Sequence, residues 1–139
     1  MSAGADPYGR DLRLVFAPAV EGADLAVGAA DLETVSGIAN LCQALTLRLL
    51  VDRGELTALG HPRYGTRARE LLGQTLDRAN LELLRRYVRQ SIQEDPRVAE
   101  VLGVAVSARP QAPGVVDIVA QVRGLDGAQT QVEATLDAR

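Results

Sequence analysis

Cys42 and His61 are the only cysteine and the only histidine of this 139-residue chain. A thiol and an imidazole can form a nucleophilic pair when the thiol lies at an exposed, electropositive position. Cys42, however, falls on the apolar side of a predicted helix, where a cysteine normally serves as a small buried hydrophobic residue. One residue of each type also cannot form an internal disulfide or a zinc site of cysteine and histidine ligands. We therefore predict no catalytic residue, no metal site and no cofactor.

The carboxylates offer a second kind of chemistry. Glu55, paired with Asp52 or Glu94, could act in glycoside hydrolysis, which needs two carboxyl groups about 5–9.5 Å apart across a sugar-binding cleft. With 18 acidic residues the chain offers many such pairs, and their spacing singles none of them out. The rings available to stack on sugars are few, namely Tyr8, Phe16, Tyr64 and Tyr87. We therefore expect no enzyme, and keep a lysozyme-like peptidoglycan hydrolase of a tail as the alternative function.

The charge and composition exclude several classes of partner and mechanism. All 15 basic residues are arginine, which excludes a Walker phosphate lysine, a Schiff-base lysine and a Ser-x-x-Lys acylation pair. A net charge of −3 and the shortage of aromatic rings speak against nucleic-acid binding. The sequence shows neither an apolar run of the ~20 residues that span a bilayer nor a secretion signal at its start. We expect a protein of the producing cell's cytosol with neither nucleic acid nor membrane as a partner.

The segment Leu59–Gly65 is dense in residues with special backbone or hydrogen-bonding properties. Two glycines and a proline fix an unusual path of the chain, while His61, Arg63 and Tyr64 offer hydrogen bonds. Two interpretations stay open at this point. The segment is either a docking surface for another protein or a rigid turn whose polar groups bond to its own backbone.

The sequence Glu94-Asp95-Pro96-Arg97 places two carboxylates at the predicted C-terminus of a helix, where they oppose the helix macrodipole. Such an arrangement costs about 0.3–1 kcal/mol per charge, so we expect a cation nearby. Arg97 could supply it in a bidentate pair, and so could an arginine of a partner protein. If the segment docks to a partner, Arg97→Ala should leave the isolated domain folded but prevent its incorporation into a larger assembly.

Two amphipathic helices must position these side chains. The first carries apolar residues at three- and four-residue steps from Val35 to Leu49 and should end near Asp52. Its candidate N-caps are Asp31, Thr34 and Ser36. The second helix runs over about 75–94 and stops before a proline, which disfavours helical geometry at the preceding residue. A short helical turn at 67–72 lies between them.

The last third of the chain changes to the two-residue period of β-strands. Apolar residues alternate with polar ones over 102–106, 116–122 and 130–136, and the loops between these segments suit hairpins. We therefore predict a three-stranded antiparallel meander with one polar face. Two short extended segments, at 12–16 and 24–27, precede the helices.

Together these elements predict one α+β domain over residues 1–139, with residues 1–9 flexible. Two main helices should pack on a small antiparallel sheet with a C-terminal three-stranded meander. Because a meander has two outer strands, its edges could accept an extended segment from another chain.

Five short segments stand in a distinctive order along the chain: GIANLCQAL at 37–45, RLL at 48–50, RGEL at 53–56, GHPRYG at 60–65 and DPRV at 95–98. This order, followed by the meander, resembles the GPW-type baseplate wedge family of contractile tails, which includes phage protein W and the type VI secretion subunit TssE. The form here is most similar to members from extracellular contractile injection systems. Where the family has Glu-Pro-Arg, this chain has Asp95-Pro96-Arg97 preceded by Glu94, and either carboxylate could fill the family's role.

The resemblance implies a structural baseplate subunit. Family members lie in the inner baseplate around spike and tube, contact larger wedge proteins through the Glu-Pro-Arg region, and resemble the strand-exchange domain of the sheath protein, so they can start sheath assembly. The expected partners are therefore wedge and sheath proteins, with spike, hub and tube proteins as further candidates. Members have also carried a lysozyme label, which no residue here supports. From residues and resemblance together, the candidate partner-binding residues are Glu94, Asp95, Pro96, Arg97, Glu55, His61, Arg63 and Tyr64.

Overall fold

The computed structural model of the protein describes residues 6–16, 23–25, 34–61, 63–74 and 76–137. In this part of the chain the elements are β1 (Arg10–Leu12), β2 (Leu14–Phe16), β3 (Ala23–Leu25), β4 (Thr34–Ser36), α1 (Ile38–Leu50), the 3-10 helix η1 (Thr57–Leu59), α2 (Arg69–Leu72), α3 (Arg78–Gln93), β5 (Val98–Ala108), β6 (Val115–Gly124) and β7 (Gln129–Asp137). The predicted α+β class is confirmed, and both main helices lie where their apolar periodicity predicts them.

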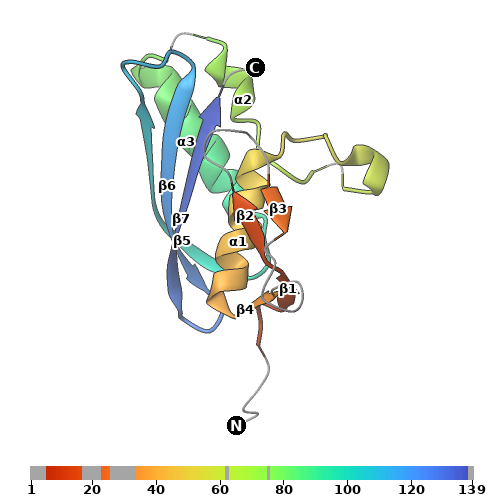
Figure 1. Cartoon of the computed structure of the whole chain (residues 1–139). Helices are drawn as coiled ribbons and strands as arrows, with labels where there is room; N and C mark the ends of the chain where they lie inside the picture. The colour runs from red at the N-terminus through yellow and green to blue at the C-terminus, as the bar shows by residue number, and fades with distance from the viewer. Residues whose placement is uncertain (1–5, 17–22, 26–33, 62, 75, 138–139) are drawn as a thin grey trace.

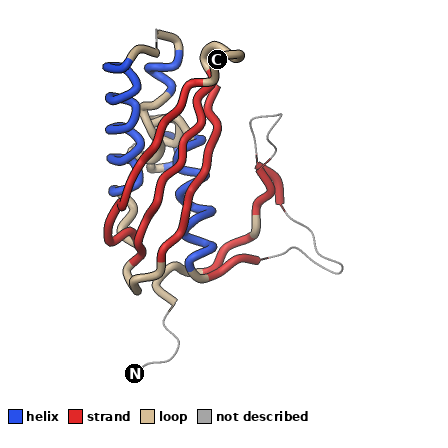
Figure 2. Tube along the Cα trace, turned by 90° about the vertical axis from the view of Figure 1, so that its left-hand side faces the viewer, coloured by secondary structure: helices blue, strands red, loops and turns tan. Residues whose placement is uncertain are grey.

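The C-terminal strands form an antiparallel sheet in the order β5-β6-β7. Helices α1 and α3 lie on one face of it, with α3 packed on β5 and α1 on β7 (Figures 1 and 2). The other face carries the polar residues that alternate along β7. The predicted meander with one polar face is therefore confirmed.

The core lies between this sheet and the two helices. Its largest fully buried side chains come from α1, α3, β6 and β7, together with one residue that precedes β1: Leu41, Leu45, Leu49, Leu84, Val88, Ile92, Val116, Ile118, Val122, Val132, Leu136 and Tyr8. Burying one such side chain stabilises the fold by about 1.5–3 kcal/mol. The helical stripes and the strand alternation thus meet in one apolar layer.

One apolar residue of β5 does not face the core as its position in the alternation predicts. The register shifts between Val101 and Gly103, so Leu102 is an extra residue opposite β6. Leu102 is 37% exposed, whereas Val101 is buried. A bulge reverses the alternation locally, which is why the sequence pattern was wrong at this residue.

The N-terminal strands form two small antiparallel pairs, β1 with β4 and β2 with β3. They lie on the side of α1 that faces away from the main sheet (Figure 1). Gln43 of α1 holds them, since its Nε2 donates to the carbonyl oxygen of Leu12 at 2.9 Å and its Oε1 accepts from the amide of Leu14 at 2.8 Å. The extended segment predicted at 12–16 is therefore part of two strands.

The start of α1 differs from the prediction. Gly37 is the N-cap and has no side-chain cap, while Thr34 and Ser36 belong to β4. Asp31 lies outside the described residues. Instead, the carboxylate of Asp6 accepts a hydrogen bond from the amide of Gly37 at 2.8 Å. A residue 31 positions away thus serves the start of the helix, and no local capping pattern could show it.

Candidate functional site

The turn Glu94–Arg97, here called the elbow, joins α3 to β5 and contains a buried ion pair. Asp95 is 2% exposed. Arg97 donates three hydrogen bonds to the carboxylate of Asp95. They come from its Nε at 2.9 Å, from a terminal guanidinium nitrogen at 2.7 Å and from its backbone amide at 2.9 Å. Burial alone raises the pKa of Asp95, but these hydrogen bonds and the charge of Arg97 outweigh it and hold the pKa below its usual value.

The same arginine ties the elbow to two distant parts of the chain. Its remaining terminal nitrogen donates to the carbonyl oxygen of Tyr8 at 3.1 Å, and its own carbonyl oxygen accepts from the amide of Leu125 at 3.2 Å. Asn40 of α1 donates to the Tyr8 carbonyl as well, at 2.8 Å. Asp95 and Arg97 therefore form the internal pair that the sequence left open, and they fix the shape of the elbow.

Glu94 points to a different partner, which the sequence did not reveal. Its carboxylate accepts two hydrogen bonds from the guanidinium of Arg53, at 2.9 and 3.0 Å. This bidentate pair joins the end of α3 to the loop after α1 and offsets the cost of an acid at a helix C-terminus. The two residues are 41 positions apart, so only the fold brings them together.

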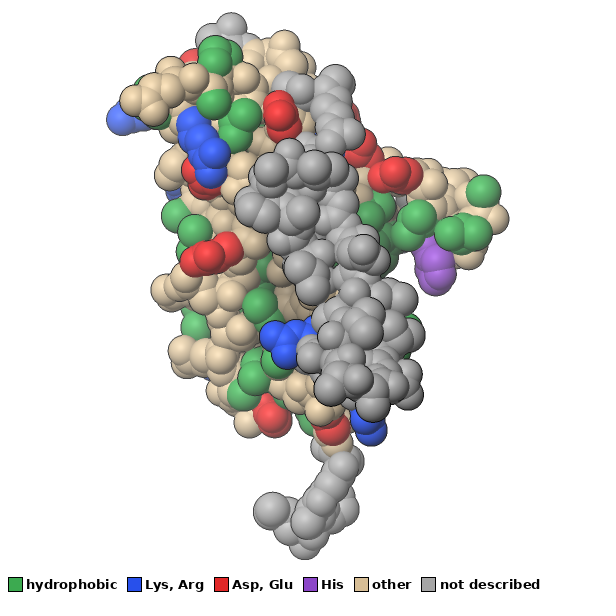
Figure 3. Space-filling model, viewed as in Figure 1, with side chains coloured by type: hydrophobic (Ala, Val, Ile, Leu, Met, Phe, Trp, Pro, Cys, Tyr) green, Lys and Arg blue, Asp and Glu red, His purple; other side chains and the backbone are tan. Residues whose placement is uncertain are grey.

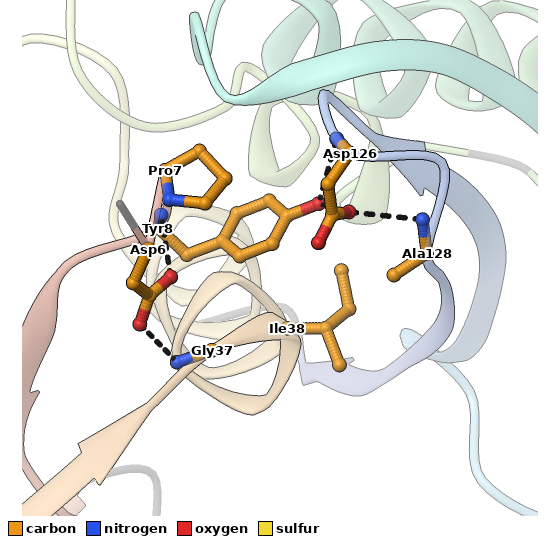
Figure 4. A pocket seen from close by; sticks show the side chains of 7 residues that line it. All are labelled: Asp6, Pro7, Tyr8, Gly37, Ile38, Asp126 and Ala128. Atoms are coloured by element: carbon orange, nitrogen blue, oxygen red, sulfur yellow. Dashed lines mark hydrogen bonds between the residues drawn. The ribbon is translucent and has the colours of Figure 1, made fainter. Parts of the chain in front are cut away.

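Tyr8 lies in a hollow between the start of α1 and the β6–β7 turn (Figure 4). Its hydroxyl donates to the carboxylate of Asp126, which also accepts from the amide of Ala128 at 2.9 Å. Burial and this hydrogen bond raise the pKa of Tyr8. Of the residues 1–9 that were expected to be flexible, 1–5 lie outside the described residues, while Tyr8 is 2% exposed and part of the core. One aromatic residue in a polar terminal stretch gave no periodic signal.

The loop between α1 and α2 projects from the body of the molecule, with η1 at its tip (Figure 1). Two backbone hydrogen bonds join the two ends of the loop. The amide of Thr66 donates to the carbonyl oxygen of Val51, and the amide of Arg53 donates to the carbonyl oxygen of Thr66, each at 3.0 Å. Gly65 has a φ of 99°, and a Cβ there would collide with the carbonyl oxygen of Val51. Ser91 of α3 donates to the Gly65 carbonyl at 2.8 Å. Gly65, the second glycine of the GHPRYG segment, is thus needed because the backbone of Val51 comes so close at the base of the loop.

A hollow of about 450 Å³ lies where this loop meets α1 and the end of α3. Its lining is Arg48, Gly60, His61, Arg63, Tyr64 and Glu94. The guanidinium carbon of Arg48 lies 4.6 Å from the centre of the Tyr64 ring, a cation–π contact. Burial raises the pKa of Tyr64, although the charge of Arg48 acts in the opposite direction. Of the predicted partner-binding residues, His61, Arg63, Tyr64 and Glu94 therefore share one hollow, here called the loop hollow.

The carboxylates considered for hydrolysis each form a hydrogen bond or an ion pair within the chain. Glu55 lies outside the loop hollow, and its carboxylate accepts from the amide of Asp52 at 3.1 Å. Asp52 pairs with Arg69 at 3.1 Å, and Glu94 pairs with Arg53. Among the described residues no cluster of His, Cys, Asp and Glu could hold a metal ion. No helix in the same part of the chain has the length and apolar character to cross a membrane.

The outer edge of β7 is a second candidate site. The amide of Gly124 donates to the carbonyl oxygen of Ala128 at 2.8 Å. Since antiparallel pairs alternate between bonded and non-bonded positions, the even-numbered residues 130–136 bond to β6, and the backbone of the odd-numbered residues points away from it. Cys42 supports this assignment, because its Sγ donates to the carbonyl oxygen of Gln131 at 3.4 Å. In the described part of the chain no further strand pairs with β7.

The opposite edge, along β5, is less regular. Two register shifts interrupt its pairing with β6, between Val98 and Glu100 and between Val101 and Gly103. Each edge also has one side-chain contact to a carbonyl oxygen at 3.4 Å, from Arg89 to Val101 on β5 and from Cys42 to Gln131 on β7, so the register shifts are what distinguish them. Bulges twist an edge and disfavour the addition of a strand. The regular, nine-residue β7 is therefore the better acceptor of an extended segment.

Comparison with known proteins agrees with this description of the fold. No protein-family model matches the chain, and a search of curated proteins finds no match. Among solved structures, the chain is similar to the crystal structure of a "putative tail lysozyme" from Geobacter sulfurreducens, with a TM-score of 0.62 and 20% identity over 73% of this chain and 91% of that one. At this identity the likeness shows a shared fold with a protein of that description.

Proposed function

We propose that the protein is a structural subunit of the baseplate of a contractile, phage-tail-like particle. In this role it joins larger wedge proteins to the sheath and starts sheath assembly by accepting an extended strand. The observation that carries the proposal is the regular outer edge of β7, which pairs with no further strand in the described part of the chain and whose backbone meets Cys42 at Gln131 alone among the contacts described above. Such an edge binds an extended segment through main-chain hydrogen bonds, and alternate side chains set the register. The order of the sequence motifs and the fold shared with a tail protein support the same role.

The contacts with wedge proteins are assigned to the projecting loop and the elbow. Glu55, His61 and Arg63 are exposed there, and Tyr64 and Glu94 line the loop hollow together with His61 and Arg63. Asp95, Pro96 and Arg97 act in this proposal by holding the elbow in shape. The protein is made in the cytosol and acts only within the assembled particle, without catalysing a reaction.

Glu133→Pro tests the strand addition. Position 133 directs its backbone away from β6, so proline removes an outward N–H and leaves the pairing with β6 intact. Glu133→Ala is the matched control, because it loses the same side chain and keeps the N–H. We expect producing cells with Glu133→Pro to yield baseplates without sheath, whereas those with Glu133→Ala yield sheathed particles. Electron microscopy of purified particles reads the outcome.

Sheathed particles from both variants, each folded by circular dichroism, would contradict strand addition at β7. A zymogram separates this function from peptidoglycan hydrolysis. The purified protein should give no clearing, and clearing that disappears in Glu55→Gln would establish the hydrolase in its place.

A further inference from the structure

The loop hollow contains two arginines, Arg48 and Arg63, that have no hydrogen-bond acceptor among the described residues. Arg63 is exposed and has no acceptor among the described residues. The Nε atom of Arg48 is buried and has no hydrogen-bond partner. Glu94, the one acid in the lining, already accepts two hydrogen bonds from Arg53. The hollow therefore has a net positive lining in a chain whose net charge is −3.

Arg48 carries most of this inference. The Tyr64 ring covers its guanidinium at 4.6 Å, so it is partly removed from water. A buried donor without an acceptor costs about 1–3 kcal/mol, more when it is charged. The charge of Arg48 also acts on Asp95, but Arg97 already occupies both oxygens of that carboxylate. Because Nε is buried, an acceptor brought from outside would bind the terminal nitrogens of Arg48, which form no hydrogen bond among the described residues.

The rim of the hollow adds an apolar element. Leu59, at the tip of the loop and next to Gly60 of the lining, is 72% exposed. Figure 3 shows apolar side chains (green) and the single histidine (purple) together on the projecting lobe. A ligand suited to this surface combines a carboxylate with a neighbouring apolar side chain.

The surroundings favour a carboxylate over a polyphosphate. Asp52 and Glu55 lie in the same loop and Glu94 lies in the lining itself, so the basic surface is limited to the two arginines. Binding to a nucleic-acid backbone needs an extended basic surface. Two arginines in one small hollow instead match the planar, bidentate recognition of a single carboxylate.

We propose that the loop hollow binds an acidic segment of a partner protein, with a Glu or Asp carboxylate on Arg48 and Arg63 and an adjacent apolar side chain against Leu59. The inference rests on the proposed function only in that the chain works by binding other proteins. It does not depend on strand addition at β7.

A titration of the ¹⁵N-labelled full chain tests the inference. The probe is the capped peptide EELEEL, and the signals followed are the Nε–Hε resonances of the arginines. We expect saturable shifts of Arg48 and Arg63, with binding roughly tenfold weaker in Arg48→Gln and roughly threefold weaker in Arg63→Gln. Arg86→Gln, which removes an exposed arginine of α3, is the matched control and should bind as the unaltered chain does.

Three results would overturn the inference: no saturable shift of Arg48, an equal shift with the basic peptide KKLKKL, or equally tight binding of inorganic phosphate. The Glu133→Pro variant should bind EELEEL normally. If EELEEL fails to bind while Glu133→Pro still abolishes sheathing, the loop hollow is refuted and the strand addition stands. If EELEEL binds as expected while Glu133→Pro still yields sheathed particles, only the strand addition is refuted.

Discussion

The elbow and the loop hollow adjoin each other at the end of α3 and share Glu94. The buried charged group of the elbow is engaged in hydrogen bonds, whereas the arginines of the hollow lack acceptors among the residues that the structure describes. In the elbow, the buried carboxylate of Asp95 accepts three hydrogen bonds from Arg97. In the hollow, Arg48 has a buried donor without an acceptor and Arg63 has no acceptor among the described residues. The comparison teaches that an unusual charge pair in a sequence can serve the fold, while the surface proposed to bind a partner contains charged groups without a hydrogen-bond acceptor in the described part of the chain.

Arg97→Ala should show the largest effect on this comparison. It leaves Asp95 buried without its counter-charge, and we expect a loss of about 3 kcal/mol in the free energy of unfolding, measured with urea. From the sequence, we expected Arg97→Ala to stay folded and fail only in assembly. Because the pair is internal and Asp95 is buried, we now expect the isolated domain itself to be destabilised. Arg48→Gln, in the same assay, should cause no loss of stability, because it removes a buried donor that has no acceptor within the described part of the isolated chain. Equal losses in both variants would contradict the contrast between elbow and hollow.

The pH dependence of stability sharpens the same contrast with a smaller effect. Because the pKa of folded Asp95 lies below its usual value of 3.8, the ion pair contributes fully above that pH and its contribution is lost as the pH falls below it. Unfolding with urea between pH 6 and roughly pH 3 should therefore show a steeper loss of stability in the unaltered chain than in Asp95→Asn. Parallel curves would show that Asp95 is not held as an ion pair.

The sequence predicted the regular part of the molecule well. Periodicities of 3.6 and 2 depend on which face is buried, so α1, α3 and the even positions of β6 and β7 could be placed from their apolar residues alone. The prediction failed at Leu102, where a bulge inserts one residue into β5. A bulge changes no composition and therefore leaves no trace in the pattern.

The candidate site was predicted only in part. The residue types of the loop indicated His61, Arg63 and Tyr64 as candidates. The elbow was identified because its two carboxylates oppose the macrodipole at the C-terminus of a helix. Arg48 and Arg53 were missed because each meets its neighbours across the fold rather than along the chain. The burial of Tyr8 was missed for the same reason, since its partner Asp126 is 118 residues away.

Hydrogen exchange along β7 tests the central claim most directly, because it reports each backbone amide separately. In the isolated chain, the amides of Val132 and Ala134 should exchange slowly through their bonds to β6, while those of Glu133 and Thr135 should exchange fast. When exchange is carried out in sheathed particles and read by NMR after quenching and dissolution, all four amides should be slow. Fast exchange of Glu133 and Thr135 in the particle would contradict the pairing of β7 with a strand from another protein.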